Sequence, residues 1–267
     1  MSVNIAVCQF IAGLDINANI KNCLQLIDEA AAAGAKLAVL PEAVMFFDPA
    51  KEQQGQHGEA VDGPFVTAIA AGAKKAGIAV LVGMTEKIDD EHRDSNTVVA
   101  ISAAGELIGS YRKIHLYDAF GYRESDTIKP ADIGDPLVFD VDGVTVGVLT
   151  CYDLRFPEAF RWVVDAGAQV VALPAAWAAG PMKETHWRTM LASRAIENTV
   201  YLAAAGQTGP VSCGQSLIID PMGTVRAGAG DKPGIAVGVV DPELLAAVRE
   251  VNPSLGNRRF SVVADRS

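Results

Sequence analysis

Cysteine is scarce in this sequence, and the cysteines that it has are not paired. The 267 residues include four of them, Cys8, Cys23, Cys151 and Cys213, and no two stand in a Cys-x-x-Cys arrangement. Disulfide frameworks and structural zinc sites both need cysteines at short, regular spacings. We therefore expect each thiol to be free, and neither a disulfide scaffold nor a metal site to be present.

Long apolar runs and an excess of positive charge are also missing. No apolar run approaches the roughly 20 residues that a membrane-spanning helix needs, and the first residues lack the basic segment of a signal peptide. The formal net charge is -10. A surface of that sign repels nucleic acid and anionic membranes. We expect a cytoplasmic protein that acts on a small molecule and binds neither nucleic acid nor membrane.

What the sequence does have is a large apolar fraction in an alternating pattern. Half of its residues are hydrophobic, which is enough for a substantial core. Short apolar runs typical of strands alternate with longer segments typical of helices, and no linker of low complexity interrupts them. This alternation predicts the α/β class and one domain over residues 1–267.

Cys151 stands out from the other cysteines because of its position. It follows an apolar strand predicted over residues 144–150, and polar residues come next in the chain. A free cysteine is usually a small buried hydrophobe, which fits Cys8 and Cys23 on their apolar segments and makes Cys213 structural or pocket-lining. The carboxyl end of a strand is where α/β sheets collect their ligands, so we interpret Cys151 as a nucleophile.

Two further reactive side chains stand at the ends of predicted strands. Glu42 follows the apolar run 36–40, and Lys113 follows the run 107–111. A thiol needs a base near neutral pH, and a carboxylate such as Glu42 can take its proton. An ammonium such as Lys113, with the backbone N-H after Cys151, can stabilise the oxyanion of a tetrahedral intermediate. Alone, Glu42 would read as a helix cap and Lys113 as a solvated charge, but together they predict acyl transfer from an amide.

Three motifs in order carry a resemblance to a known family. They are Leu40-Pro-Glu42, Tyr111-Arg-Lys-Ile-His-Leu116 and Cys151-Tyr-Asp-Leu-Arg-Phe-Pro-Glu158. They resemble the glutamate, lysine and cysteine motifs of the nitrilase (carbon-nitrogen hydrolase) superfamily, in its amidase-like members. Glu124, in a polar segment over residues 117–136 that predicts a long ordered loop, resembles the family's second active-site glutamate.

The resemblance implies a fold, an assembly and a mechanism. The fold would be a four-layer αββα sandwich that forms a homodimer or higher homo-oligomer, and the reaction would need neither metal nor organic cofactor. By similarity, Glu42 deprotonates Cys151, and Lys113 with the backbone amide of Tyr152 holds the oxyanion. Water activated by Glu42 then hydrolyses the thioester, while Glu124 positions the substrate or holds Lys113.

Substrate choice is predicted from residues near the nucleophile. Tyr152 and Arg155 are placed to bind a substrate carboxylate, unless Arg155 pairs with Glu158 instead. Trp177 and Phe46 are expected to wall the pocket. The predicted substrate is a small, carboxylate-bearing amide. The alternatives are a nitrilase or N-carbamoyl amidohydrolase, and, as a different class, a catalytically silent binding or scaffold protein.

Overall fold

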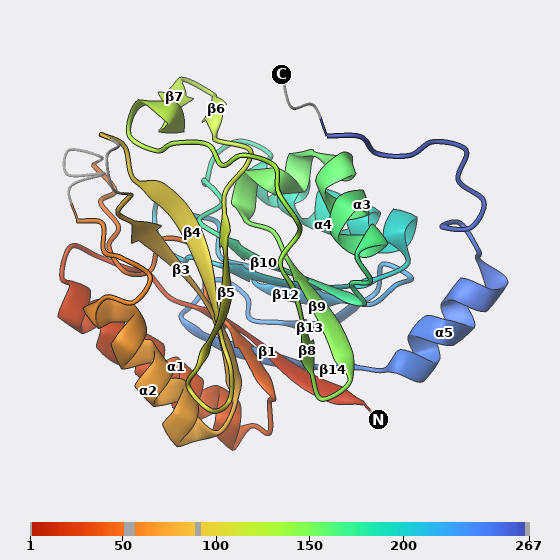
Figure 1. Cartoon of the computed structure of the whole chain (residues 1–267), viewed down its shortest axis with the longest axis horizontal. Helices are drawn as coiled ribbons and strands as arrows, with labels where there is room; N and C mark the ends of the chain where they lie inside the picture. Colours follow the sequence, from red (N-terminus) through yellow and green to blue (C-terminus); the bar gives the residue numbers. More distant parts are fainter. Residues whose placement is uncertain (1, 51–56, 89–91, 265–267) are drawn as a thin grey trace.

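The protein is built around two six-stranded β-sheets that pack face to face (Figure 1). The computed structural model describes residues 2–50, 57–88 and 92–264. The first sheet has the order β14 (Gly234–Val240), β1 (Val3–Gln9), β2 (Leu37–Val39), β3 (Ala79–Glu86), β4 (Ser95–Ile101) and β5 (Leu107–Arg112). The second has the order β13 (Val225–Gly228), β12 (Leu217–Ile219), β11 (Tyr201–Gly206), β10 (Val170–Ala175), β9 (Val144–Val148) and β8 (Val138–Val141).

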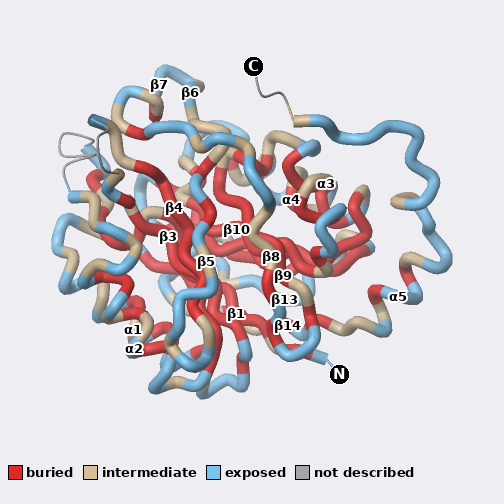
Figure 2. Tube along the Cα trace, in the orientation of Figure 1, coloured by how far each residue is buried: buried red, intermediate tan, exposed pale blue. Residues whose placement is uncertain are grey.

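Helices cover the outer faces of both sheets. Helices α1 (Ile16–Ala32) and α2 (Pro64–Ala76) pack on the first sheet, and α3 (Pro157–Asp165) and α4 (Lys183–Asn198) pack on the second. Helix α5 (Pro242–Val251) follows β14, and an exposed C-terminal segment continues beyond it (Figure 2). The predicted α/β class and four-layer αββα sandwich are confirmed. One domain over residues 1–267 stays a prediction, and Met1 and residues 265–267 lie outside the described residues.

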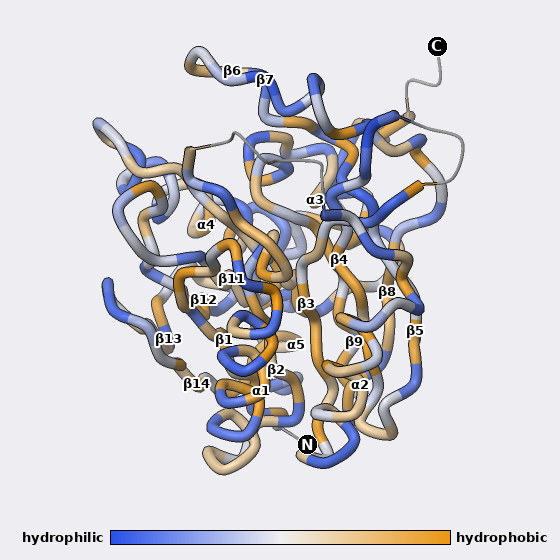
Figure 3. Tube along the Cα trace, turned by 90° about the vertical axis from the view of Figure 1, so that its left-hand side faces the viewer, coloured by the Kyte–Doolittle hydropathy of each residue, from blue (hydrophilic) through white to orange (hydrophobic). Residues whose placement is uncertain are grey.

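Each sheet has three parallel strands at its centre, namely β1, β2 and β3 in the first and β9, β10 and β11 in the second. Parallel strands covered on both faces need continuous apolar runs, and every residue of β2 and β10 is buried. The buried residues form one core between the sheets that extends under α3 and α4, and another under α1 and α2. Figure 3 shows the hydrophobic colour running along β3 and β4.

The strand directions decide which loops meet. Strand β5 runs antiparallel to β4, which runs antiparallel to β3, so β5 points the same way as β2. The carboxyl ends of β2 and β5 therefore lie at one edge of their sheet. The predicted long loop crosses this edge and carries a two-stranded hairpin, β6 (Asp118–Ala119) and β7 (Tyr122–Arg123), and a short 3-10 helix, η1 (Glu124–Asp126).

No helix of the described ranges is long and apolar enough to cross a membrane.

Candidate active site

The turn that carries Cys151 is tight and well braced. Cys151 begins a 3-10 helix, η2 (Cys151–Arg155), with a φ of 44°, a region of backbone conformation that residues other than glycine rarely adopt. Such backbone costs on the order of 1–3 kcal/mol and persists where surrounding contacts enforce it. Here a capping box joins Thr150 and Asp153, and the Thr150 hydroxyl donates to the Pro174 carbonyl at 2.8 Å. These contacts fix the direction of the Cys151 side chain.

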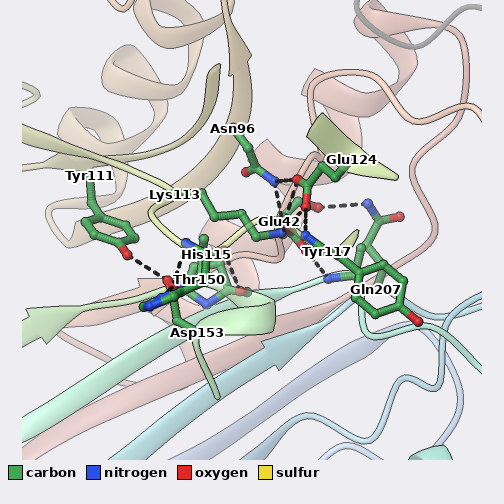
Figure 4. A network of polar contacts seen from close by, with 12 residues as sticks. Glu42, Asn96, Tyr111, Lys113, His115, Tyr117, Glu124, Thr150, Asp153 and Gln207 are labelled. Atoms are coloured by element: carbon green, nitrogen blue, oxygen red, sulfur yellow. Dashed lines mark hydrogen bonds and ion pairs between the residues drawn. The ribbon is translucent and has the colours of Figure 1, made fainter. Parts of the chain in front are cut away.

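Asp153 is a bracing residue that sequence reasoning missed. It is fully buried and accepts hydrogen bonds from the Thr150 backbone N-H at 2.9 Å and the Tyr111 hydroxyl at 2.7 Å (Figure 4). Its other oxygen lies 2.7 Å from Nδ1 of His115. His115 therefore braces the nucleophile turn through Asp153. The available signal was the Thr-x-x-Asp spacing of Thr150 and Asp153, which is typical of a capping box.

Glu42 is held at the other side of the site, just beyond the end of β2. Its carboxylate is buried, and Oε1 accepts from Lys113 Nζ at 2.9 Å and from Asn96 Nδ2 at 2.7 Å. Oε2 accepts from the backbone N-H of Ala176 at 2.7 Å, a contact that joins the loops after β2 and β10. Burial works to raise the pKa of Glu42, but the Lys113 charge and hydrogen bonds from Cys151, Lys113 and Asn96 outweigh it, so the pKa is lowered. Glu42 is therefore ionised at neutral pH.

Lys113 lies between two carboxylates. Its Nζ is 2.9 Å from Glu42 Oε1 and 2.8 Å from Glu124 Oε2, and only 2% of its side chain is exposed. Burial works against the charged form, but the charges of Glu124 and Glu42 raise the pKa of Lys113 well above its usual value. Glu124 also accepts from Asn96 Nδ2 at 2.9 Å and from the backbone N-H of Tyr117 at 2.7 Å. The ammonium is thus fixed in position and permanently charged.

The Cys151 thiol is protonated in this arrangement. Burial raises its pKa well above the usual value, and the negative charge of Glu42 raises it further, although Lys113 opposes the shift. The site accordingly holds a neutral thiol that donates a hydrogen bond to an ionised carboxylate. Such a pair can transfer a proton from sulfur to oxygen as the sulfur attacks a substrate, which is general-base catalysis rather than attack by a preformed thiolate.

Most of the expected site residues line one cavity of about 260 Å³. They are Glu42, Lys113, Glu124, Cys151, Tyr152 and Trp177. Two expected residues, Arg155 and Phe46, are absent from the described lining. Phe47 lines the cavity, whereas the ring of Phe46 packs 4.2 Å from that of His57.

Arg155 packs against two rings of the cavity lining, with its guanidinium carbon 5.0 Å from the centre of the Trp177 ring and 5.8 Å from that of the Tyr152 ring. Its Nη2 lies 3.4 Å from Nδ1 of His186. Among the described contacts no ion pair joins Arg155 to Glu158. Arg155 is absent from the described lining of this cavity, and its expected contact with a substrate carboxylate stays a prediction.

Three more polar residues that sequence reasoning missed belong to the site. Asn96 bridges Glu42 and Glu124 through one amide nitrogen. Gln207 donates from Nε2 to the Glu42 carbonyl at 2.8 Å and so holds the backbone of the glutamate loop. Lys183, the first residue of α4, lines the cavity. A lone asparagine, glutamine or lysine carries no motif, so only the fold could identify them.

In the part of the chain that the structure describes, no cluster of three or more histidine, cysteine, aspartate or glutamate side chains has a geometry suited to hold a metal ion.

The sequence matches a known protein family and several curated proteins. Residues 4–250 match the family model described as carbon-nitrogen hydrolase. The deaminated glutathione amidase of Escherichia coli O157:H7 is 38% identical over 244 residues, which cover 91% of this chain and 92% of that protein.

Solved structures are similar as well. The NitFhit protein of C. elegans superposes with a TM-score of 0.88 at 30% identity, and the match covers 97% of this chain but 65% of that longer one. A double mutant of the amidase from Nesterenkonia sp. AN1, in complex with acrylamide, gives a TM-score of 0.82 at 27% identity and covers 96% of this chain and 94% of that one.

Proposed function

Because the chain belongs to the carbon-nitrogen hydrolase family, we propose that it is an amidase that hydrolyses a small, carboxylate-bearing amide through a thioester on Cys151. The observation that carries the proposal is the contact of Cys151, Glu42 and Lys113 within one cavity. Relatives named deaminated glutathione amidase, and a similar structure that is an amidase in complex with acrylamide, support amide hydrolysis as the reaction.

The first half of the reaction forms the thioester. Cys151 Sγ attacks the amide carbonyl carbon while its proton passes to Glu42. The carbonyl oxygen becomes an oxyanion, which the Lys113 ammonium and the Tyr152 backbone N-H stabilise. As the tetrahedral intermediate collapses, the carbon-nitrogen bond breaks and the Glu42 proton passes to the nitrogen, so ammonia or an amine leaves.

The second half hydrolyses the thioester. Water attacks the acyl carbon while Glu42 takes its proton, and the same oxyanion contacts act again. The carbon-sulfur bond then breaks, the proton returns to sulfur, and the carboxylic acid leaves. Glu124 acts by holding the Lys113 ammonium in line with the developing oxyanion, with Asn96 fixing the two carboxylates relative to each other.

A screen of ammonia release tests the reaction type. We expect the purified protein to release ammonia from amides that carry a carboxylate, and to do so faster than from the nitrile or the N-carbamoyl compound of the same carbon skeleton. The Lys113 ammonium in the cavity favours a carbonyl that develops an oxyanion, which a nitrile lacks. Faster release from either alternative substrate would assign the protein to that reaction, and no release from any of the three would favour the silent binding protein.

We also propose that the enzyme is a cytoplasmic homodimer. Apolar side chains that stand exposed at the end of α5 and on the C-terminal segment support the dimer, since 81% of Val251, 92% of Phe260 and 84% of Val263 are open to solvent. Large apolar side chains exposed to solvent are typical of surfaces that contact another protein. Sedimentation at micromolar concentration should give twice the mass of the chain, and removal of residues 253–267 should lower the dimer fraction. A monomer in both cases would contradict the dimer.

A further inference from the structure

The cavity contains a second lysine that the mechanism above does not use. Lys183 is only 7% exposed and lines the same cavity as Cys151. Its Nζ donates to the Tyr117 hydroxyl at 3.1 Å and lies 3.5 Å from the centre of the Phe120 ring. The ammonium is therefore held in place by a hydroxyl and an aromatic face, both of which leave its positive charge uncompensated.

The charge of Lys183 has no carboxylate partner among the residues that the structure describes. Lys113, by contrast, is paired with two. The largest charge effect on Lys183 comes from another cation, Arg155, whose guanidinium packs on the same Phe120 and Trp177 rings. Burial and then the Arg155 charge lower the pKa of Lys183. The Arg155 Nε atom is also buried without a hydrogen-bond partner in the described chain.

The place of Lys183 at the start of α4 adds to the positive potential around its ammonium. Lys183 is the first residue of a 16-residue helix, and no side chain caps that end. A helix N-terminus carries a partial positive charge, so a lysine there is an unfavourable choice for helix stability. A buried cation without a counter-ion is likewise costly. The two cations and the helix end all favour an anion within the cavity.

The hairpin formed by β6 and β7 places Phe120 against Lys183 in a strained backbone conformation. Its two-residue turn consists of Phe120 and Gly121, both with positive φ, at 56° and 81°. Turns of this kind favour asparagine, aspartate or glycine, and a phenylalanine with positive φ is strained. The strain delivers the ring to the Lys183 ammonium, although 69% of the Phe120 residue remains exposed. A cation that rests on a ring is oriented without being neutralised.

We propose that Lys183 is the residue that binds the carboxylate of the substrate, and that it makes the enzyme selective for amides whose acyl chain ends in a carboxylate. This inference rests on the proposed amidase function, because the carboxylate at Lys183 places the amide carbon at Cys151. Arg155 packs on the same aromatic rings as Lys183 and acts through it as a positioning residue. The carboxylate contact first expected of Arg155 is therefore assigned to Lys183.

The test compares paired substrates on the Lys183→Met variant. The pairs are monoamides of unbranched dicarboxylic acids with four to six carbons and their neutral methyl esters at the carboxylate end. We expect kcat/KM of the variant to fall about 10- to 100-fold for the carboxylates, because a charge-assisted contact is lost. For the esters it should stay within about threefold, and Lys183→Arg should restore the preference for the carboxylates. Lys74→Met, an exposed lysine of α2, is the matched control.

A binding measurement separates this inference from the amidase function. The corresponding dicarboxylates have no amide to hydrolyse, and their affinity can be measured by calorimetry. We expect wild type to bind one of them about 10- to 100-fold more tightly than Lys183→Met does. The role of Lys183 would be overturned if wild type and Lys183→Met had the same ratio of kcat/KM for carboxylate over ester substrates and bound the dicarboxylates with equal affinity. Lys183-dependent dicarboxylate binding by an enzyme that hydrolyses no amide would uphold the carboxylate site and overturn the amidase function.

Discussion

Replacement of Cys151 by alanine is expected to reduce amide turnover by about 10⁴-fold or more, because the variant lacks the atom that forms the thioester. The residue is small and 8% exposed, so the fold should tolerate the change. Ammonia release with a carboxylate-bearing amide is the measurement. The side chains of Glu42 and Lys113 remain in the variant, so any residual rate reports what they do without a nucleophile.

Cys213 provides the matched control for this substitution. It is also buried and free, and burial raises the pKa of its thiol to about 12. It is absent from the described lining of the cavity. Cys213→Ala should therefore keep wild-type turnover within about threefold. Equal loss in the two variants would mean that neither thiol is the nucleophile and that the loss follows from damage to the fold.

Replacement of Lys113 by methionine is expected to abolish turnover and to lower the free energy of unfolding at pH 7 by about 3–5 kcal/mol. The variant loses the oxyanion donor and leaves Glu42 and Glu124 buried without the cation between them. Denaturant unfolding of wild type and variant at pH 7 and at pH 4 measures the change. Lys74→Met serves as the control for loss of an exposed lysine.

The pH dependence of this effect has a definite sign. In wild type the lowered pKa of Glu42 means that its ionised form stabilises the fold at neutral pH, and that this contribution is lost as the pH falls through the lowered pKa. In the variant Glu42 loses the Lys113 charge that lowers its pKa, so its protonated form becomes more favourable. The stability difference between the two proteins should therefore shrink from pH 7 to pH 4. A difference that is absent, or that grows on acidification, would contradict the assigned ion pairs.

The main features of the site were predictable because strand direction gathers residues that are far apart in the sequence. Glu42, Lys113 and Cys151 each follow an apolar strand, and the carboxyl ends of parallel strands share an edge. The sequence pattern alone predicted the α/β class. The four-layer arrangement came from the family resemblance, because periodicity does not say which sheet a strand joins.

Other site residues were hidden for physical reasons. Asn96 stands near the start of β4, which runs antiparallel to its neighbours and so begins at the edge where β3 and β5 end. Arg155 was assigned to the substrate pocket because it closely follows Cys151, and Phe46 because it is an aromatic residue that follows a strand. Neither is in the described lining, since side-chain direction depends on the local turn. Lys183 has the appearance of an ordinary surface lysine at the start of a helix, and only packing shows that it is buried.

The central claim is that the acyl group of the substrate becomes attached to Cys151. Its most direct test is the intact mass of the enzyme, acid-quenched during turnover of a carboxylate-bearing amide, followed by peptide mapping. The account predicts an added mass equal to the acyl group, located on Cys151 and absent from Cys151→Ala. Amide hydrolysis at an undiminished rate by Cys151→Ala, or an adduct on any other residue, would contradict it.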